Sequence, residues 1–240
     1  MRYSKLLPLD VHNSWKGFLD DTILNELLLI EEKIRDNHTP PAENVLRFMV
    51  NDLDALKVII LGQDPYPEKG RATGRAFEVG DMTLWNASFK QVSLKNIVRL
   101  LHKTYNNIEN YDDIKSFNQI KEEIEKGQFN ILPPHELFKS WERQGVLLLN
   151  SYLTCEVGKP GSHREIWPEF AGRLIEYISG RKPGLKWFLW GKNANSYSEH
   201  IIKGKIYSSR HPMMCSGAYE DDFLKAICFK ETADTVNWLG

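Results

Sequence analysis

The sequence predicts an α/β fold in which a short parallel sheet of about four strands is flanked by helices on both faces. The first observation is a set of four short apolar runs, at 58–61, 146–149, 187–190 and 206–207. Continuous apolarity over about four residues is typical of strands that are buried on both faces. The second observation is that helical patterns separate most of these runs, at 88–103, 134–144, 165–180 and 193–202. Alternating strands and helices indicate a layered α/β fold with right-handed crossovers.

Composition places the chain among globular proteins. Of its 240 residues, 42% are hydrophobic and 26% are charged, which excludes a largely disordered chain. No repeat, linker or low-complexity tract divides the sequence, so we expect a single domain over 1–240. The net charge of −1 means that the field of the whole molecule cannot recruit a polyanion, and any basic footprint must be local.

Cysteine usage and hydropathy bear on the compartment. The three cysteines form no CxxC pair, which favours a reducing cytoplasm. No segment approaches the roughly 18 apolar residues of a membrane span, and the first residues lack the features of a signal peptide. We therefore expect a cytoplasmic protein without membrane contact, and we expect it to be a monomer.

Two segments lie outside the strand and helix alternation. Residues 21–36 place apolar side chains at mostly helical spacing and predict an amphipathic, core-packing helix, so we interpret 1–40 as an N-terminal helical extension. The segment between residues 106 and 126 contains six acidic residues and only three lysines. We interpret 105–130 as an acidic, solvated surface excursion within the same domain.

Polar and titratable residues follow each predicted strand. Asp64 comes after the first strand, Asn150 after the second and His211 after the fourth, while a Gly-Lys-Asn turn follows the third. Open α/β sheets bind ligands at the carboxyl ends of their strands. We therefore expect Asp64, Asn150 and His211 to converge on one crevice.

Several common sites are absent from the sequence. It contains no GxGxxG, GxxxxGK[ST] or GxSxG motif and no zinc motif, so we expect no metal and no organic cofactor. Taken singly, Asp64 could be a turn residue and His211 a surface histidine. Together with Asn150 they form a set suited to binding and hydrolysis, because an amide donates and accepts like the edge of a nucleobase.

The motifs around these residues resemble those of the family-one uracil-DNA glycosylases. Gly62-Gln63-Asp64-Pro65-Tyr66 resembles the water-activating motif, and Leu147 to Thr154 the LLLN..LT segment that reads uracil. Three further stretches match in order: Gly161-Ser162-His163 with Trp167, Trp190-Gly191, and His211-Pro212. The resemblance covers residue 56 to the C-terminus, apart from the acidic excursion.

The resemblance implies hydrolysis of the N-glycosidic bond of deoxyuridine that is flipped out of DNA, which releases uracil and leaves an abasic site. Asp64 would activate the attacking water and stabilise the oxocarbenium-like sugar. His211 would donate a hydrogen bond to uracil O2, where negative charge develops as the base leaves.

The resemblance also implies how the base is bound. Asn150 would read uracil N3 and O4, Phe77 would stack on the base, and Tyr66 would exclude the thymine methyl group at C5. The backbone of Gln63 would complete the contacts. The alternatives are that Phe77 is ordinary core and that Tyr66 is only a turn residue.

Contacts to DNA are expected from two loops. Ser162 and Ser216 are candidates for phosphate contacts. The family's HPSPLS loop reads His-Pro-Met-Met-Cys-Ser here, so we expect Met214, or less favourably Met213, to wedge into the duplex. Cys215 then packs under the loop.

A basic stretch bears on the DNA contacts, and a substitution beside Asp64 bears on the rate of catalysis. The stretch 181–211 has a net charge of +6, which suits phosphate contacts unless its charges are scattered over several faces. Pro67 replaces the histidine that usually follows GQDPY, which bears on the rate.

The implied partners are DNA containing uracil, single- or double-stranded, and a uracil-glycosylase inhibitor protein. Two other functions stay open. The first is a glycosylase of the same fold that acts on another damaged base. The second is a catalytically impaired DNA- or lesion-binding protein, against which the retention of Asp64 argues.

Overall fold

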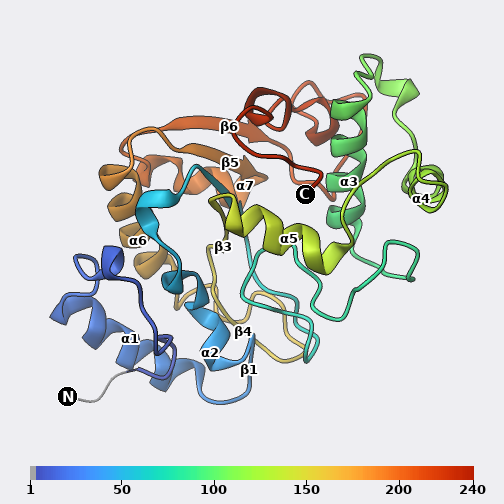
Figure 1. Ribbon diagram of the computed structural model, residues 1–240. Coiled ribbons are helices and arrows are strands. Elements are labelled where there is room, and N and C mark those ends of the chain that lie inside the picture. The colour runs from blue at the N-terminus through green and yellow to red at the C-terminus, as the bar shows by residue number, and fades with distance from the viewer. Residues whose placement is uncertain (1–3) are drawn as a thin grey trace.

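A four-stranded parallel sheet forms the centre of the computed structural model, which describes residues 4–240 (Figure 1). The strand order is β3-β2-β5-β6. Val58 pairs with Val146 on one side and with Lys186 on the other. The predicted fold class is confirmed, and the strands extend over β2 (Val58–Gly62), β3 (Val146–Asn150), β5 (Lys186–Trp190) and β6 (Lys205–Ser209).

Helices cover both faces of this sheet because successive side chains of each strand point to opposite faces. Ile59 and Leu61 pack with α1 (Asp21–Ile34) and α6 (Pro168–Arg181). Val58 and Ile60 pack with α3 (Val92–Tyr105) and α5 (Pro134–Arg143). Burial on both faces explains why these strands read as continuous apolar runs.

The remaining elements are short. The predicted helix over 193–202 is α7 (Lys192–Ser196) followed by a 3-10 turn, Tyr197–His200. The other elements of this group are β1 (His38–Thr39), β4 (Cys155–Glu156), α2 (Ala42–Val45) and α4 (Phe117–Glu125). β1 and β4 pair antiparallel, outside the main sheet. Single 3-10 turns lie at Asn13–Trp15, Arg47–Val50, Leu53–Ala55, Tyr111–Asp113, Phe223–Lys225 and Lys230–Thr232.

The N-terminal segment packs into the core through α1. The Asp20 carboxylate caps this helix by accepting a hydrogen bond from the Ile23 amide at 2.9 Å. The apolar positions that face inward belong to the same core cluster as α6. Residues 1–3 of the predicted extension lie outside the described residues.

The acidic segment 105–130 is less solvated than its charge indicates. It carries α4, in which Phe117 and Ile120 are buried against α3. Their i, i+3 spacing puts both on one face of the helix, and the acids occupy the other positions. One of the acids, Glu123, also faces α3, where its Oε2 lies 2.7 Å from Nε2 of the buried His102.

The order of the strands decides where a ligand can bind. The chain passes from β2 to β3 on one side, and then returns through α6 to β5 on the other side of β2. A crevice opens at such a reversal, outside the carboxyl ends of the strands. Within residues 4–240, no helix is long and apolar enough to cross a membrane.

Candidate active site

A pocket of about 290 Å³ lies at the carboxyl ends of the strands. Its wall contains six residues predicted to hold or hydrolyse the substrate, namely Gln63, Asp64, Tyr66, Phe77, Asn150 and His211. A hollow of about 340 Å³ beside Lys57 and Gly145, at the amino ends of the strands, contains none of the predicted residues. The chemistry-bearing side chains therefore gather at the smaller of these two hollows.

Asp64 lies in the turn that follows β2, with its carboxyl group half-buried. Its Oδ2 accepts a hydrogen bond from the Gly161 amide at 2.8 Å. Burial raises the pKa of the Asp64 carboxyl above its usual range, and the Gly161 hydrogen bond opposes that rise by favouring the anion. The result is a partly desolvated carboxylate with one oxygen fixed in place.

A buried network holds the loop that carries Gly161. The Trp167 indole donates to Thr154 Oγ1 at 2.8 Å, and Thr154 Oγ1 lies 2.8 Å from His163 Nδ1. Burial lowers the pKa of His163 and keeps the ring neutral. The Thr154 hydroxyl can therefore donate to His163 while it accepts from Trp167. These residues belong to the motifs that carry the resemblance, and their role here is to position the partner of Asp64.

Asn150 ends β3 directly beside Gly62, the last residue of β2. A Cβ atom on Gly62 would lie 2.4 Å from Asn150 Oδ1 and 3.5 Å from Phe77 Cε2. The amide and the ring therefore converge over this glycine. Asn150 is only 6% exposed, and its side-chain amide makes no hydrogen bond to any residue between 4 and 240.

Phe77 has a left-handed backbone, with φ of 65°, which is uncommon for a bulky residue. Its ring centroid lies 5.4 Å from that of Trp190 and 6.4 Å from that of His211. The Tyr66 hydroxyl donates to the Phe77 carbonyl at 3.4 Å, and burial raises the pKa of Tyr66, which keeps the phenol protonated. Both side chains line the pocket, so neither is only core or only part of a turn.

His211 follows β6 and lies over Gly191, where a Cβ atom would come within 2.8 Å of His211 Cβ. Its Nδ1 accepts a hydrogen bond from the Met213 amide at 3.2 Å. Burial lowers the pKa of His211, so the ring is neutral near pH 7. Because Nδ1 is an acceptor, the single ring proton is on Nε2.

The loop after His211 exposes both methionines. Met213 lines the pocket and is 58% exposed, and Met214 is 54% exposed. Cys215 is half-buried against the core, and its Sγ lies 3.2 Å from the Pro212 carbonyl oxygen. Burial raises the pKa of the Cys215 thiol to about 12. This arrangement agrees with a cysteine under the loop and methionines at its tip.

The two predicted phosphate-contacting serines are not among the residues that line the pocket. The Ser162 hydroxyl accepts a hydrogen bond from the Glu156 amide at 2.7 Å. The Ser216 amide donates to Asp222 Oδ2 at 2.6 Å. Both residues shape their loops in this structure, and their contact with DNA stays a prediction.

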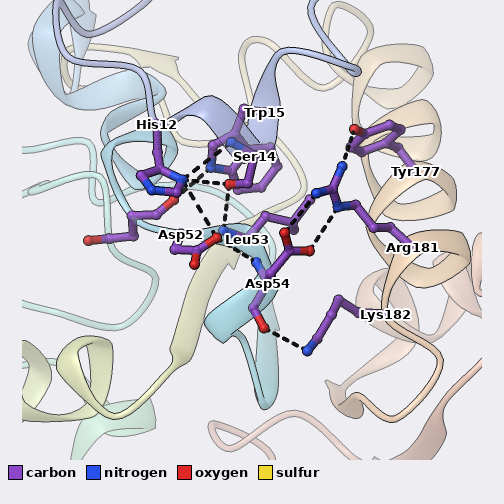
Figure 2. A network of polar contacts seen from close by, with 10 residues as sticks. His12, Ser14, Trp15, Asp52, Leu53, Asp54, Tyr177, Arg181 and Lys182 are labelled. Atoms are coloured by element: carbon purple, nitrogen blue, oxygen red, sulfur yellow. Dashed lines mark hydrogen bonds and ion pairs between the residues drawn. The ribbon is translucent and has the colours of Figure 1, made fainter.

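The basic stretch 181–211 does not form one patch beside the pocket. Arg181 binds the Asp54 carboxylate with both Nε and Nη2, and Lys182 donates to the Asp54 carbonyl at 2.6 Å (Figure 2). Asp54 precedes β2, and Lys186 and Lys205 begin β5 and β6. These charges therefore lie at the amino ends of the strands, and the alternative of charges scattered over several faces is the correct one.

Three residues that sequence reasoning did not single out also shape the site. Ser93, in the first turn of α3, and Arg75 line the pocket. The buried Asn96 side chain donates to the Pro212 carbonyl at 2.6 Å and fixes the loop after His211. No local sequence pattern marks these three residues, because each acts through a contact between segments that lie far apart in the chain.

Comparison with known proteins gives one consistent family. The model of the uracil DNA glycosylase superfamily matches residues 49–229. A uracil-DNA glycosylase from Dichelobacter nodosus is 30% identical over 218 residues, which cover 86% of this chain and 83% of that protein. One from Francisella philomiragia is 31% identical over 224 residues, covering 89% of this chain and 90% of the relative.

Solved structures share the fold. The UNG crystal structure from Nitratifractor salsuginis matches with a TM-score of 0.66 at 21% identity, covering 85% of each chain. A mimivirus UNG variant in complex with UGI matches with a TM-score of 0.61 at 23% identity, covering 84% of this chain and 70% of that one. The family match spans the strands and loops that build the pocket, and the chain belongs to the uracil-DNA glycosylase superfamily.

Proposed function

We propose that this protein excises uracil from DNA by hydrolysing the N-glycosidic bond, and that the pocket receives the flipped uracil. The family and its curated relatives support uracil excision in DNA repair. The observation that carries the assignment of the pocket is the Asn150 amide, which is nearly buried, lacks a protein partner among residues 4–240 and faces the cavity. Such a group is costly unless a ligand completes its hydrogen bonds.

The polar edge of uracil complements this amide. The side-chain oxygen of Asn150 accepts from uracil N3–H, and its NH₂ group donates to O4. Cytosine presents an amino donor at position 4 and an acceptor at N3, so both hydrogen bonds would be lost. The Phe77 ring lies against one face of the base, and Tyr66 stands at the C5 edge.

The chemistry divides between Asp64 and His211. The Asp64 carboxylate orients a water and accepts its proton as the water oxygen bonds to C1′ of the sugar. The C1′–N1 bond breaks, and its electron pair leaves with the uracil. The Nε2–H of neutral His211 donates to uracil O2, where the negative charge gathers. These two groups come from different strand ends and face one cavity.

Pro67 closes the turn that carries Asp64. Its carbonyl accepts a hydrogen bond from the Gly158 amide at 2.8 Å, so the residue ties the turn to the segment that holds Gly161. Proline has no side-chain donor or acceptor. Pro67 therefore takes no part in the proposed reaction through its side chain. Asp64 accepts the proton, and His211 stabilises the uracil anion.

Duplex DNA requires a group that fills the gap left by the flipped nucleotide. We assign this role to Met213 and Met214, because both are exposed and Met213 lies at the pocket wall. Methionine is among the side chains that wedge between base steps. Truncating the wedge to alanine lowers uracil release from duplexes more than from single strands, whereas Cys215→Ala leaves that ratio unchanged. Equal ratios in all three variants would contradict the assignment.

Binding of an inhibitor protein is a second element of the proposal. A mimivirus UNG with the same fold has been solved in complex with UGI. We expect UGI to block uracil release by this protein, and a titration of the release rate with UGI tests it. We also propose that the protein acts as a monomer, and analytical sedimentation of the protein, at the concentrations used in the titration, measures its mass.

The function itself is tested with a panel of oligonucleotides that each carry one modified base. We expect release of free uracil and retention of cytosine and thymine. Release of hypoxanthine or a damaged pyrimidine without release of uracil would favour the glycosylase for another base. Tight binding to lesions without release of any base would favour the lesion-binding protein.

A further inference from the structure

A cluster of four charged side chains, of which Glu78 is buried and the other three are partly buried, adjoins the Phe77 wall of the pocket, and its Arg75 also lines the pocket. Arg75 and Glu78 have side-chain exposures of 9% and 6%, and Glu142 and Arg47 of 18% and 23%. Arg75 Nη1 donates to Glu78 Oε2 at 2.9 Å, and its Nη2 donates to Glu142. Arg47 Nη1 donates to the other oxygen of Glu142 at 2.9 Å. Two positive and two negative charges thus pair within one partly buried cluster.

The Arg75–Glu78 pair brackets Phe77 in the chain. Glu78 Oε2 also accepts from the Thr73 hydroxyl at 2.5 Å, and Thr73 Oγ1 accepts from the Arg75 amide at 3.2 Å. These bonds close the segment 73–78 into a compact loop. Phe77 lies inside it with a left-handed backbone, φ of 65°.

The loop is fixed to the rest of the molecule on two sides. The Ala76 amide donates to the Leu148 carbonyl of β3 at 3.1 Å. Gly74 packs so closely that a Cβ atom would lie 2.1 Å from the Asn44 carbonyl oxygen. Glu142 belongs to α5, so the Arg75–Glu142 ion pair joins the loop to a core helix.

We infer that Arg75 and Glu78 are positioning residues that hold the Phe77 ring in place as the stacking wall for the base. A left-handed backbone is unfavourable for a side chain with a Cβ atom, and it persists only where the surroundings enforce it. The Arg75–Glu78 bond spans this residue and supplies that enforcement. The inference rests on the proposed role of Phe77 in binding uracil.

A purely structural role for Arg75 and Glu78 must be distinguished from a positioning role. Removing one partner of a buried ion pair destabilises a protein wherever the pair lies, so a loss of thermal stability is expected for both roles. A positioning role requires that the effect on uracil binding passes through the Phe77 ring. In a variant without the Phe77 ring, substitution of Arg75 or Glu78 should then no longer change uracil binding.

The test measures inhibition by free uracil and the rate of uracil release for Glu78→Gln and Arg75→Met. Each variant is made with Phe77 and again with Phe77→Ala. We expect each to weaken uracil inhibition by roughly tenfold, which corresponds to about 1.4 kcal/mol. In the Phe77→Ala background the same substitutions should have no further effect on inhibition.

Arg47→Met is the matched control, because it removes an ion pair to the same Glu142 while the hydrogen bonds of Glu78 to Thr73 and Arg75 stay in place. Methionine also keeps an unbranched stem where that of Arg47 packs against Gly74. It should lower thermal stability and leave uracil inhibition unchanged. An equal loss of uracil affinity with and without the Phe77 ring would overturn the inference. A loss of uracil affinity in Arg47→Met as large as that in Glu78→Gln would also overturn the inference.

A second measurement is independent of activity. The Phe77 and Trp190 rings lie 5.4 Å apart between centroids, close enough for nuclear Overhauser effects between their protons. These should persist in Arg47→Met and weaken in Glu78→Gln. Failure of the wild type to release uracil would contradict the proposed function, whereas unchanged ring contacts in Glu78→Gln would contradict the positioning role.

Discussion

Replacing Gly62 by alanine tests the geometry of base recognition with a single added carbon atom. The new Cβ would lie 2.4 Å from Asn150 Oδ1 and 2.9 Å from Ala76 Cβ, where ordinary contact begins near 3.4 Å. The Asn150 amide must therefore move by 3.4 minus 2.4 Å, about 1 Å, to relieve the first contact. Ala76 cannot yield easily, because its amide is bound to the Leu148 carbonyl.

A misplacement of about 1 Å can cost about 100-fold in rate. We therefore expect Gly62→Ala to lower kcat/KM for uracil release from a single-stranded oligonucleotide by about 100-fold. Inhibition by free uracil should weaken, because the amide no longer meets the base. The added carbon also overpacks the strand end, which costs about 1–3 kcal/mol of stability. A thermal melt shows that the variant is folded at the assay temperature.

Two controls isolate the contact. Gly184→Ala adds the same atom where no heavy atom lies within 4 Å, and it should leave the rate unchanged. In an Asn150→Ala background, Gly62→Ala should cause little further loss, since the displaced oxygen is absent. A folded Gly62→Ala variant with the wild-type rate would refute the placement of Asn150 against the base.

Three further outcomes follow from the pocket. Asn150→Asp exchanges the amide donor for an acceptor and should shift release from uracil toward cytosine, measured on matched oligonucleotides; an unchanged preference would count against Asn150 as the reader. Tyr66→Ala opens space at C5 and should admit thymine, which a thymine-release assay detects; continued exclusion of thymine would mean that another group forms this wall. The rate should fall on the acid side, because Asp64 must be ionised and His211 neutral. Burial raises the pKa of Asp64 above 3.8 and lowers that of His211 below 6.5, so a kcat/KM profile that rises on acidification would contradict these assignments.

The sheet and the convergence of Asp64, Asn150 and His211 could be predicted from the sequence. Strands buried on both faces leave apolar runs that are easy to recognise, and parallel strands bring their carboxyl ends to one edge. The turn after each run therefore marks the site. Local apolar patterns and one rule of sheet topology are therefore enough to locate these three residues.

Other features depend on contacts between distant segments, which no local pattern reports. The Gly161 amide meets Asp64 across 97 positions of the chain, and Arg75 meets Glu142 across 67. Strand direction also determines at which end of the sheet the charged residues of a sequence segment lie. Arg181 and Lys186 are close in sequence to the His211 loop, yet they lie at the other end of the sheet.

In the proposed reaction, the Asp64 carboxylate accepts the proton of the attacking water. The most direct measurement compares wild type and Asp64→Asn for single-turnover uracil release and for binding to the same oligonucleotide. A positioned base contributes about 10²–10⁴-fold to the rate. We expect Asp64→Asn to lose uracil release by a factor of that size and to keep a nearly unchanged affinity for DNA. An Asp64→Asn variant that keeps its release rate, or that loses binding as much as rate, would contradict this role of Asp64.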